Sequence, residues 1–344
     1  MAQLILAWLL VWGAPAFALT VQPRAIASHP GRSVFQGTKF GGLSALAFHD
    51  GVVYLLSDDR GRNGSPRFYE ASLKIEGERA VLQPRRVRSL KNVPGLDEFK
   101  TNLDPEGFAR QGDGGFFLSS EANTHSRPRG KNRILRLSAE GRYLGELDLP
   151  DEVQPEPLGL QKKGTQNNAG PEGLSLTPRG DHLWVGYERA LTQEKEARVV
   201  RLDRHRRDLR GGFVFEKSHR YRMSDPDFGT LEVIRGVSEV LAVDDTRLLV
   251  LERTGILSSR FTLTFGGALF LADCSGDVCR KTKVLDLDRD LKKIRGGKPV
   301  ANFEGLAWGP RLADGSASLL LLSDNNFMKD DDTELIVLSV KDGP

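Results

Sequence analysis

The most informative pattern in the chain is Asn302-Phe-Glu-Gly-Leu-Ala-Trp-Gly-Pro310, followed by Ser318-Leu-Leu-Leu-Leu-Ser-Asp-Asn-Asn-Phe327. Each half reads as a β-strand with a carboxylate at a fixed place. Glu304 opens the first half beside a glycine, and Asp324 closes the apolar run of the second. That run is too short to cross a membrane as a helix. The pattern therefore predicts two neighbouring strands that carry one acid each.

The same template recurs along the chain. Its first half reappears around the leading positions Ser44, Glu106, Glu172 and Glu239. With Glu304, these positions are separated by 62, 66, 67 and 65 residues. A period of this length, filled with short β-rich runs and turn residues and without amphipathic helical stretches, is typical of propeller blades, each a four-stranded sheet set round a central axis.

The fold predicted from this period is all-β, a single β-propeller of about five four-stranded blades, with six blades as the alternative. The last copy, residues 302–344, contains only three strand-like runs, whereas residues 19–28 alternate enough to form a strand. We expect this N-terminal strand to join the last blade and so close the ring, because closure hides sheet edges that would otherwise invite aggregation.

The first eighteen residues read as a secretory signal peptide. Leu4 to Trp12 form an apolar core, and Ala16-Phe-Ala18 provides a small-residue cleavage site. The expected organisation is a signal peptide at residues 1–18 and one propeller domain at residues 19–344. We expect a periplasmic or secreted monomer with no transmembrane segment after signal cleavage.

Charge gives no indication of a nucleic-acid partner. The 49 basic and 46 acidic side chains leave a formal net charge of +3. The third repeat contains a run of arginines, but Asp203 and Asp208 interrupt it and no aromatic stacking platform accompanies it. We interpret this run as a solvated outer hairpin; its members are Arg198, Arg201, Arg204, Arg206, Arg207 and Arg210.

The only two cysteines, Cys274 and Cys279, enclose a turn-like Ser-Gly-Asp-Val. In an exported protein this spacing predicts a short hairpin disulfide. Two thiols without a nearby histidine cannot supply the four ligands of a zinc site.

The recurring acids are the candidate functional residues. In a propeller the first strand of each blade lines the central channel, so an acid repeated there forms a ring of carboxylates. The first set is Glu106, Glu172, Glu239 and Glu304. The second set ends the neighbouring strand and adds an acidic layer near one rim: Asp58, Glu121, Glu188, Glu252 and Asp324. Glu172 and Glu304 are the candidate catalytic carboxylates, and the other seven are candidate metal ligands.

Clustered carboxylates repel one another and require compensation. Hard oxygen ligands without Cys or His clusters suit Ca²⁺. Arg60, Arg189 and Arg253 each follow an acid of the second set closely, so purely structural ion pairs are the alternative. At the rim, Asn325 beside Asp324 is a candidate substrate-binding residue, and the basic polar loop 123–132, which includes His125, should overhang the same end because it follows Glu121.

Ordered motifs of the sequence resemble a known family. These motifs are Asn168-Ala-Gly-Pro-Glu-Gly-Leu-Ser-Leu-Thr-Pro178, Leu249-Val-Leu-Glu-Arg253, Asn302 to Pro310 and Ser323-Asp-Asn-Asn-Phe327. They resemble the phytase-like family of exported bacterial proteins, described as having esterase-like activity, and the likeness covers residues 37–340. The resemblance implies a propeller distantly akin to the calcium-dependent β-propeller phytases, although the acidic signature runs of those phytases do not occur in this sequence.

In those phytases, calcium ions at one end of the channel hold substrate phosphates and activate a water. The resemblance therefore implies a calcium-binding hydrolase acting on a phosphoester or related ester, with Arg60, Arg189 and Arg253 as phosphate clamps. The alternative, from another class, is a non-catalytic propeller of the cell envelope whose rim binds a glycan, a lipid or a protein.

Overall fold

The computed structural model describes residues 19–96, 103–225, 232–257 and 263–342. Apart from a 3-10 turn η1 at Asp151–Val153 and the four-residue helix α1 at Leu287–Asp290, the regular structure of these residues is β-strand. The prediction of an all-β chain built from four-stranded sheets is confirmed. The signal peptide predicted for residues 1–18 lies outside the described residues.

Three sheets each consist of four strands that are consecutive in the chain and hydrogen-bonded in order. The first is formed by β8 (Pro105–Arg110), β9 (Phe116–Ser120), β10 (Arg133–Leu137) and β11 (Tyr143–Glu146). The second is formed by β12 (Pro171–Leu176), β13 (His182–Tyr187), β14 (Val199–Arg207) and β15 (Phe213–Arg222). The third is formed by β16 (Glu232–Ala242), β17 (Arg247–Leu257), β18 (Leu263–Asp273) and β19 (Arg280–Asp286).

Two further groups of four strands share one eight-stranded sheet. One group is β4 (Leu43–His49), β5 (Val52–Ser57), β6 (Arg67–Glu76) and β7 (Arg79–Ser89). The other is β20 (Phe303–Trp308), β21 (Ala317–Ser323), β22 (Thr333–Asp342) and the N-terminal strand β1 (Leu19–His29). β1 pairs antiparallel with β22, from Leu19 opposite Asp342 to His29 opposite Thr333, and a single parallel pair, Ile26 with Arg79, joins the two groups. A short hairpin, β2 (Val34–Phe35) and β3 (Thr38–Lys39), follows β1.

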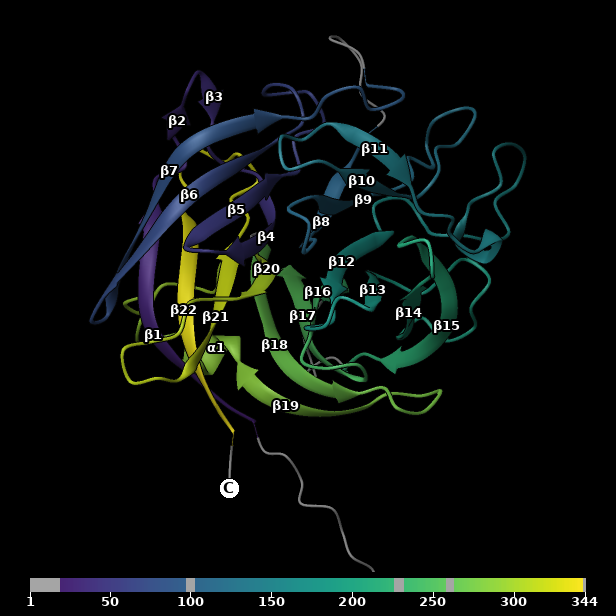
Figure 1. Ribbon diagram of the computed structural model, residues 1–344. Helices are drawn as coiled ribbons and strands as arrows, with labels where there is room; N and C mark the ends of the chain where they lie inside the picture. Colours follow the sequence, from purple (N-terminus) through teal and green to yellow (C-terminus); the bar gives the residue numbers. More distant parts are fainter. Residues whose placement is uncertain (1–18, 97–102, 226–231, 258–262, 343–344) are drawn as a thin grey trace, which may run out of the picture.

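The first strands of the five groups surround a common centre, and β20 lies beside β4 (Figure 1). The glycine that follows three of the four leading glutamates, Glu106, Glu172 and Glu304, allows these strands to approach closely. A Cβ atom on Gly107 of β8 would lie 2.1 Å from the Glu172 carbonyl oxygen of β12, and one on Gly173 of β12 would lie 2.5 Å from the Val240 nitrogen of β16. The Glu-Gly pair of the repeat therefore positions an acid where neighbouring sheets meet.

Burial explains why the inner strands read as continuous apolar runs. Every described residue of β9 is buried, and so is all of β21 except Ala317, because these second strands have another sheet on each face. The outer strand β7 alternates between exposed and buried residues over its first half, as a strand with one solvent-facing side does. The core thus consists of layers of side chains between adjacent sheets.

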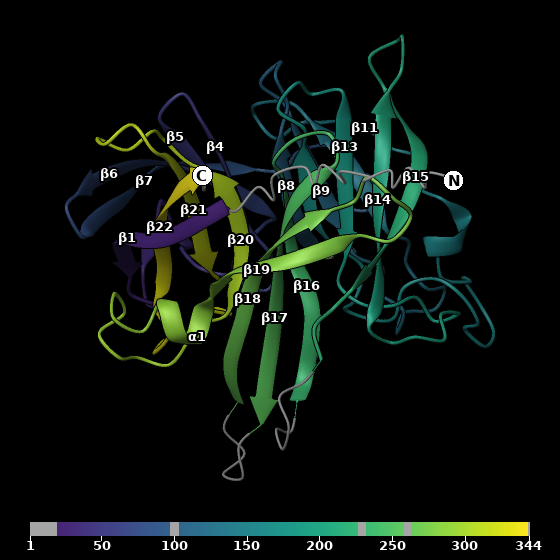
Figure 2. The ribbon, with the colours of Figure 1, turned by 90° about the horizontal axis from the view of Figure 1, so that it is seen from below.

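The sheet of β16 to β19 differs from the others in length. Its first three strands have 11 residues each, and Figure 2 shows them running side by side beyond the end of β19. The acid of the second set, Glu252, consequently lies inside β17 rather than at the strand end.

The predicted disulfide between Cys274 and Cys279 is confirmed. Its loop joins β18 to β19 and pairs with the outer strand of the preceding sheet: the Arg220 amide donates to the Asp277 carbonyl at 2.8 Å, and the Cys279 amide donates to the Arg220 carbonyl at 2.9 Å. Among the described residues, none of the helices has the length and apolar character required to cross a membrane.

Candidate functional site

Four copies of the repeat hold their acids with the same local geometry. The backbone amide of each second-set acid donates to the carbonyl two residues before the leading position. Asp58 donates to Gly42 at 2.8 Å, Glu121 to Asp104 at 3.1 Å, Glu188 to Gly170 at 2.9 Å and Asp324 to Asn302 at 2.8 Å. Both sets of acids in these copies therefore lie at one end of the first strands, around the centre.

The fourth copy breaks this pattern. β16 and β17 continue to pair beyond the acids, with Val237 opposite Glu252. The carboxylate of Glu252 accepts hydrogen bonds from the Tyr221 hydroxyl at 2.7 Å and the Ser224 amide at 2.9 Å, and it forms an ion pair with Lys281. Tyr221 and Lys281 belong to the outer strands β15 and β19, so Glu252 lies between two sheets and away from the other acids.

Glu239 is at the centre but has a different environment. Its Oε1 accepts the backbone amides of Leu174 on β12 and of its own neighbour Val240, each at 3.0 Å. Burial raises the pKa of Glu239 well above its usual value, against the opposing effect of these hydrogen bonds and of one from Leu306 on β20. The carboxyl group of Glu239 thus bridges three first strands.

Two of the predicted acids, Glu188 and Glu304, share the guanidinium of Arg253. We call these three residues, together with Arg189, the paired half of the site. Nη2 of Arg253 lies 3.0 Å from Glu188, and Nη1 forms an ion pair with Glu304. The Asn302 side chain accepts from Arg253 at 3.2 Å and donates to Glu304 at 2.8 Å. Nε of Arg189 is 3.5 Å from Glu188 but this side chain is 35% exposed. The acids in this half are therefore largely compensated.

The other acids outnumber their cations, and we call them the surplus half: Asp58, Asp104, Glu106, Glu121 and Glu172. Arg60, whose side chain is 38% exposed, forms an ion pair with Asp104 and lies 3.9 Å from Glu106. It also donates to the Asn168 side chain at 2.5 Å. Within the described parts of the chain, no Lys or Arg forms an ion pair with Asp58, Glu121 or Glu172.

The electrostatics of the surplus half reflect this imbalance. Burial and the neighbouring Asp104 and Glu188 charges raise the pKa of Glu121 to about 8. Burial and the charge of Asp324 raise the pKa of Asp58 to about 8. Burial, followed by the charge of another acid, also raises the pKa values of Glu106 and Glu172 well above normal. Without a further cation, protons must supply the missing positive charge.

The donor set of the surplus half fits a hard divalent cation. Asp104, Glu106 and Glu121 are buried, and each offers an oxygen within 4.8 Å of the others. Two oxygens bound to one Ca²⁺ are separated by at most about 4.8 Å, since each lies about 2.4 Å from the ion. Glu121 Oε2 and Asp58 Oδ1 are buried and have no hydrogen-bond partner among the described residues. Free carboxylate oxygens in an acidic, cation-poor site are what such an ion requires.

Asp324 and Asn325, at the end of β21, have different surroundings. Burial raises the pKa of Asp324 to about 6, against the opposing effect of its hydrogen bond from the Asn326 amide, which measures 2.8 Å. Asn325 is 2% exposed; its Oδ1 accepts from the amides of Gly42 at 2.9 Å and Phe327 at 3.1 Å, and its Nδ2 donates to the Asp331 carbonyl at 3.3 Å. The Asn325 side chain thus braces the loop after β21.

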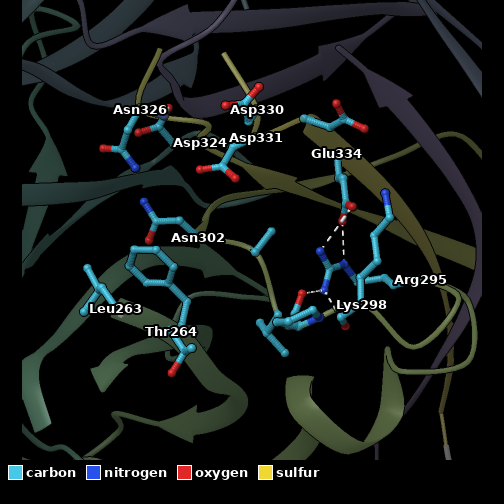
Figure 3. A pocket seen from close by; sticks show the side chains of 15 residues that line it. Leu263, Thr264, Arg295, Lys298, Asn302, Asp324, Asn326, Asp330, Asp331 and Glu334 are labelled. Carbon is cyan, nitrogen blue, oxygen red and sulfur yellow. Dashed lines mark hydrogen bonds and ion pairs between the residues drawn. The ribbon is translucent and has the colours of Figure 1, made fainter. Parts of the chain in front are cut away.

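A pocket of about 350 Å³ lies beside the paired half (Figure 3). Asn302 and Asp324 border it on one side, and Leu263 and Thr264 reach it from the projecting end of β18. Arg295, which is bonded to Glu334 at 2.5 Å, lies opposite. The long strands of the third four-stranded sheet therefore supply one wall of this pocket.

Asp104 belongs to the site although the sequence pattern did not single it out. It stands two residues before Glu106, where the other copies have Gly42, Gly170, Val237 and Asn302. An acid at a position that is otherwise neutral is a signal that could have identified it. Its effect is to concentrate negative charge in the second copy.

Comparison with known proteins gives one family and several structures. The family model that matches is described as "Phytase-like: Esterase-like activity of phytase", and it matches residues 38–327. No curated protein sequence matches the chain.

The similar solved structures are distant in sequence. One, described under the GH130 family of mannoside phosphorylases, which contains glycoside hydrolases that target β-1,2 mannosidic linkages in Candida mannan, is 12% identical, covers 96% of this chain and 95% of its own, and has a TM-score of 0.52. A glycosyl hydrolase from Bacteroides ovatus is 9% identical, with 94% of both chains covered and a TM-score of 0.47. A GH43 β-1,3-galactosidase with galactodeoxynojirimycin is 8% identical, with 86% of this chain and 90% of its own covered and a TM-score of 0.47. The first similarity supports the β-propeller fold and nothing about the substrate.

Proposed function

The chain belongs to the phytase-like family, and on that premise we propose that it is an exported calcium-binding hydrolase that cleaves a phosphoester or a related ester. The observation that carries the proposal is the surplus half of the site. Its five acids lie at the end of the first strands, where neighbouring sheets meet, and among the described residues their only ion pairs are those of the partly exposed Arg60 with Asp104 and Glu106. Such a concentration of buried acids is costly to folding unless it binds something positive.

Asp104, Glu106 and Glu121 are the residues that would hold the ion, with Asp58 beside them. The raised pKa values of these acids mean that calcium competes with protons for their oxygens. A bound calcium ion would act as a Lewis acid on the phosphoryl or carbonyl oxygen of the ester.

Among the chain's own residues, Glu172 and Arg60 have the most direct proposed roles. Burial and the charges of Glu121 and Glu188 raise the pKa of Glu172 well above its usual value. This favours the protonated carboxyl group, which would donate its proton to the leaving oxygen as the ester bond breaks. The attacking water loses a proton, which restores Glu172. Arg60 orients the anionic part of the substrate, since its guanidinium is partly exposed. Glu304, held by Arg253 and Asn302, positions Arg253 rather than exchanging protons.

The number of blades and the closure of the ring are part of the same proposal. We infer five blades, with β1 completing the sheet of β20, β21 and β22 and so closing the ring. The pairing of β1 with β22 and the contact between β20 and β4 support this count. Cleavage after Ala18 would release a monomer into the periplasm or the medium, and the disulfide is compatible with that compartment.

The proposal is tested with the purified mature chain on phosphomonoester, phosphodiester and carboxylester substrates, in calcium and in chelator. We expect turnover on at least one class, at least tenfold lower in chelator. The matched variants are Glu172→Gln, which should abolish turnover without preventing calcium binding, and Glu216→Gln on the outer strand β15, which should change neither. The absence of chelator-sensitive turnover on every class would refute the enzymatic proposal and favour the non-catalytic binding propeller.

A further inference from the structure

A second pocket, of about 670 Å³, is lined by loops, one of which begins directly after Glu121 of the surplus half. This loop contributes Thr124, His125, Arg127 and Arg129. The loop before Gly170 contributes Gln161, Gln166 and Asn167, and the loop after β13 contributes Thr192. The Asn167 side chain accepts the Thr124 amide at 3.1 Å and so joins the first two loops. The basic loop expected to overhang the acidic rim therefore borders a pocket there.

The pocket contains a buried positive charge without a negative partner. Arg129 is 8% exposed, and its guanidinium donates only to carbonyls, from Nη1 to Glu156 at 2.8 Å and from Nη2 to Gly159 at 2.7 Å. Arg67 and Arg295 are also buried, but each pairs with a carboxylate, at 2.8 Å and 2.5 Å respectively. Within the described residues Arg129 forms no ion pair, so the cost of burying its charge is not offset by a counter-ion from the chain.

Arg127 adds a second guanidinium with unused donors. Its Nη1 donates to the carbonyls of Thr124 at 3.1 Å and Ser126 at 2.8 Å. Across the parts of the chain that the structure describes, its Nε and Nη2 have no hydrogen bond and no carboxylate lies in ion-pair range. A planar fork of free N–H donors at the mouth of a polar pocket matches the oxygens of a phosphate group.

We propose that this pocket binds a phosphate group, with Arg127 as its exposed clamp and Arg129 as the buried charge behind it. The assignment of that phosphate to a substrate rests on the proposed function, because the surplus half begins three residues away at Glu121. The binding itself does not require metal or turnover. Gln166 and His125 add side-chain donors and acceptors around the same space.

The phosphate could belong to a soluble molecule or to a lipid headgroup, and the neighbouring loop bears on this. Gly159, whose carbonyl Arg129 holds, is flanked by Leu158 and Leu160, which are 65% and 79% exposed. Two exposed leucines beside an anion pocket would enter the apolar part of a bilayer if the phosphate were that of a lipid.

The primary experiment is a calorimetric titration of the chelator-treated mature chain with inorganic phosphate. We expect saturable binding that Arg127→Gln weakens at least tenfold and that Arg127→Lys restores in part, because lysine keeps the charge but loses the fork. Arg210→Gln is the matched control: Arg210 is exposed in the turn between β14 and β15, and its loss removes the same charge far from the pocket. Arg127 is exposed, so its variant should fold, which thermal unfolding would verify.

Phosphate binding that is absent, or that Arg127→Gln and Arg210→Gln weaken equally, would overturn the proposal. Because chelator removes calcium from this experiment, such a result leaves the calcium-dependent hydrolase untouched. Conversely, phosphate binding without any chelator-sensitive turnover would support the pocket and count against the enzyme.

A second measurement identifies the source of the phosphate. Vesicles of phosphatidylcholine containing phosphatidic acid present the headgroup phosphate on a bilayer, and pure phosphatidylcholine vesicles are the control. Sedimentation with the first kind only, reduced at least tenfold in a Leu158→Ser/Leu160→Ser variant that still binds inorganic phosphate, identifies a lipid. Sedimentation with neither kind, by a chain that binds inorganic phosphate, identifies a soluble phosphorylated molecule, and equal sedimentation with both kinds would overturn the assignment of the pocket to a lipid phosphate.

Discussion

The two halves of the acidic centre are built from the same repeat but differ in how their carboxylates are compensated by arginines. In the paired half, a guanidinium buried to 11% exposure lies between Glu188 and Glu304, and Asn302 holds both it and Glu304. In the surplus half, Arg60, which is 38% exposed, pairs with only two of the five acids, Asp104 and Glu106. Arg253 on the projecting strand β17 thus compensates the acids of its own half, whereas the additional acid Asp104 leaves the other half with more carboxylates than cations. Acids at equivalent positions of the repeat therefore have different roles.

The largest effect is expected from removing the guanidinium of the paired half. Arg253→Met would leave Glu188 and Glu304 buried without a counter-charge and should cost about 3–5 kcal/mol of unfolding free energy. Urea unfolding measures this cost. Arg60→Met is the comparison, because a half-exposed ion pair should contribute only about 0–1 kcal/mol. Equal losses in the two variants would contradict the division into halves.

Calcium should act on the surplus half alone. If calcium binds the folded site alone, as proposed, a concentration 100-fold above its dissociation constant should add about 2.7 kcal/mol to the unfolding free energy. A Glu106→Gln/Glu121→Gln variant should lose this gain, and Glu216→Gln on the outer strand β15 should keep it. Thermal unfolding with and without calcium measures both. A gain that persists in the double variant would place the ion elsewhere.

The pH dependence of stability sharpens the same contrast. The pKa values of Glu121 and Asp58 are raised to about 8 in the folded chain, so both groups favour the protonated folded state. In chelator, the stability that Glu121 and Asp58 add to the folded chain is fully present below their usual pKa values, near pH 4, and is lost as the pH rises towards about 8. We expect a loss of about 1–2 kcal/mol between pH 5 and pH 8, less than two independent groups would give, since the acids interact.

Calcium should abolish most of that loss, because the ion replaces the protons. Urea unfolding at both pH values, with chelator and with calcium, provides the comparison. Stability that rises with pH in chelator would show that the surplus acids ionise without penalty, contrary to their burial.

The smallest effect concerns the second arginine of the paired half. Arg189 approaches Glu188 at 3.5 Å but is 35% exposed. Arg189→Ala should therefore reduce the unfolding free energy by about 0.5 kcal/mol or less, although it pairs with the same carboxylate as Arg253. A loss comparable to that of Arg253→Met would mean that exposure is the wrong basis for ranking these pairs.

The sequence was sufficient to predict the four-stranded β units, because their inner strands appear as short apolar runs at a fixed period. It was also sufficient for the disulfide, whose two cysteines are the only ones and are close in the chain. Both features are local or periodic, so the order of residues encodes them directly.

The sequence was insufficient to predict the individual roles of the acids. Glu252 matches the template, but the continued pairing of β16 with β17 moves it between sheets, towards Tyr221 and Lys281. Glu239 also matches, yet it accepts backbone amides of neighbouring strands. These differences depend on strand length and on contacts between sheets, which a repeat pattern does not contain. Asp104 was overlooked for the opposite reason, since it departs from the repeat.

The pairing of the N-terminal strand with the C-terminal strand also has a consequence for how the protein acquires its structure. The partners of β1 are more than three hundred residues away, between Leu19 opposite Asp342 and His29 opposite Thr333. A contact between such distant parts of a chain is slow to form, because the entropy of closing the loop must be lost before the pairing is gained. During synthesis β1 must wait for β22, which is made after the other described strands. Until then the edge of β22's sheet and that of β1 are open to other chains, and this interval is the period of greatest aggregation risk.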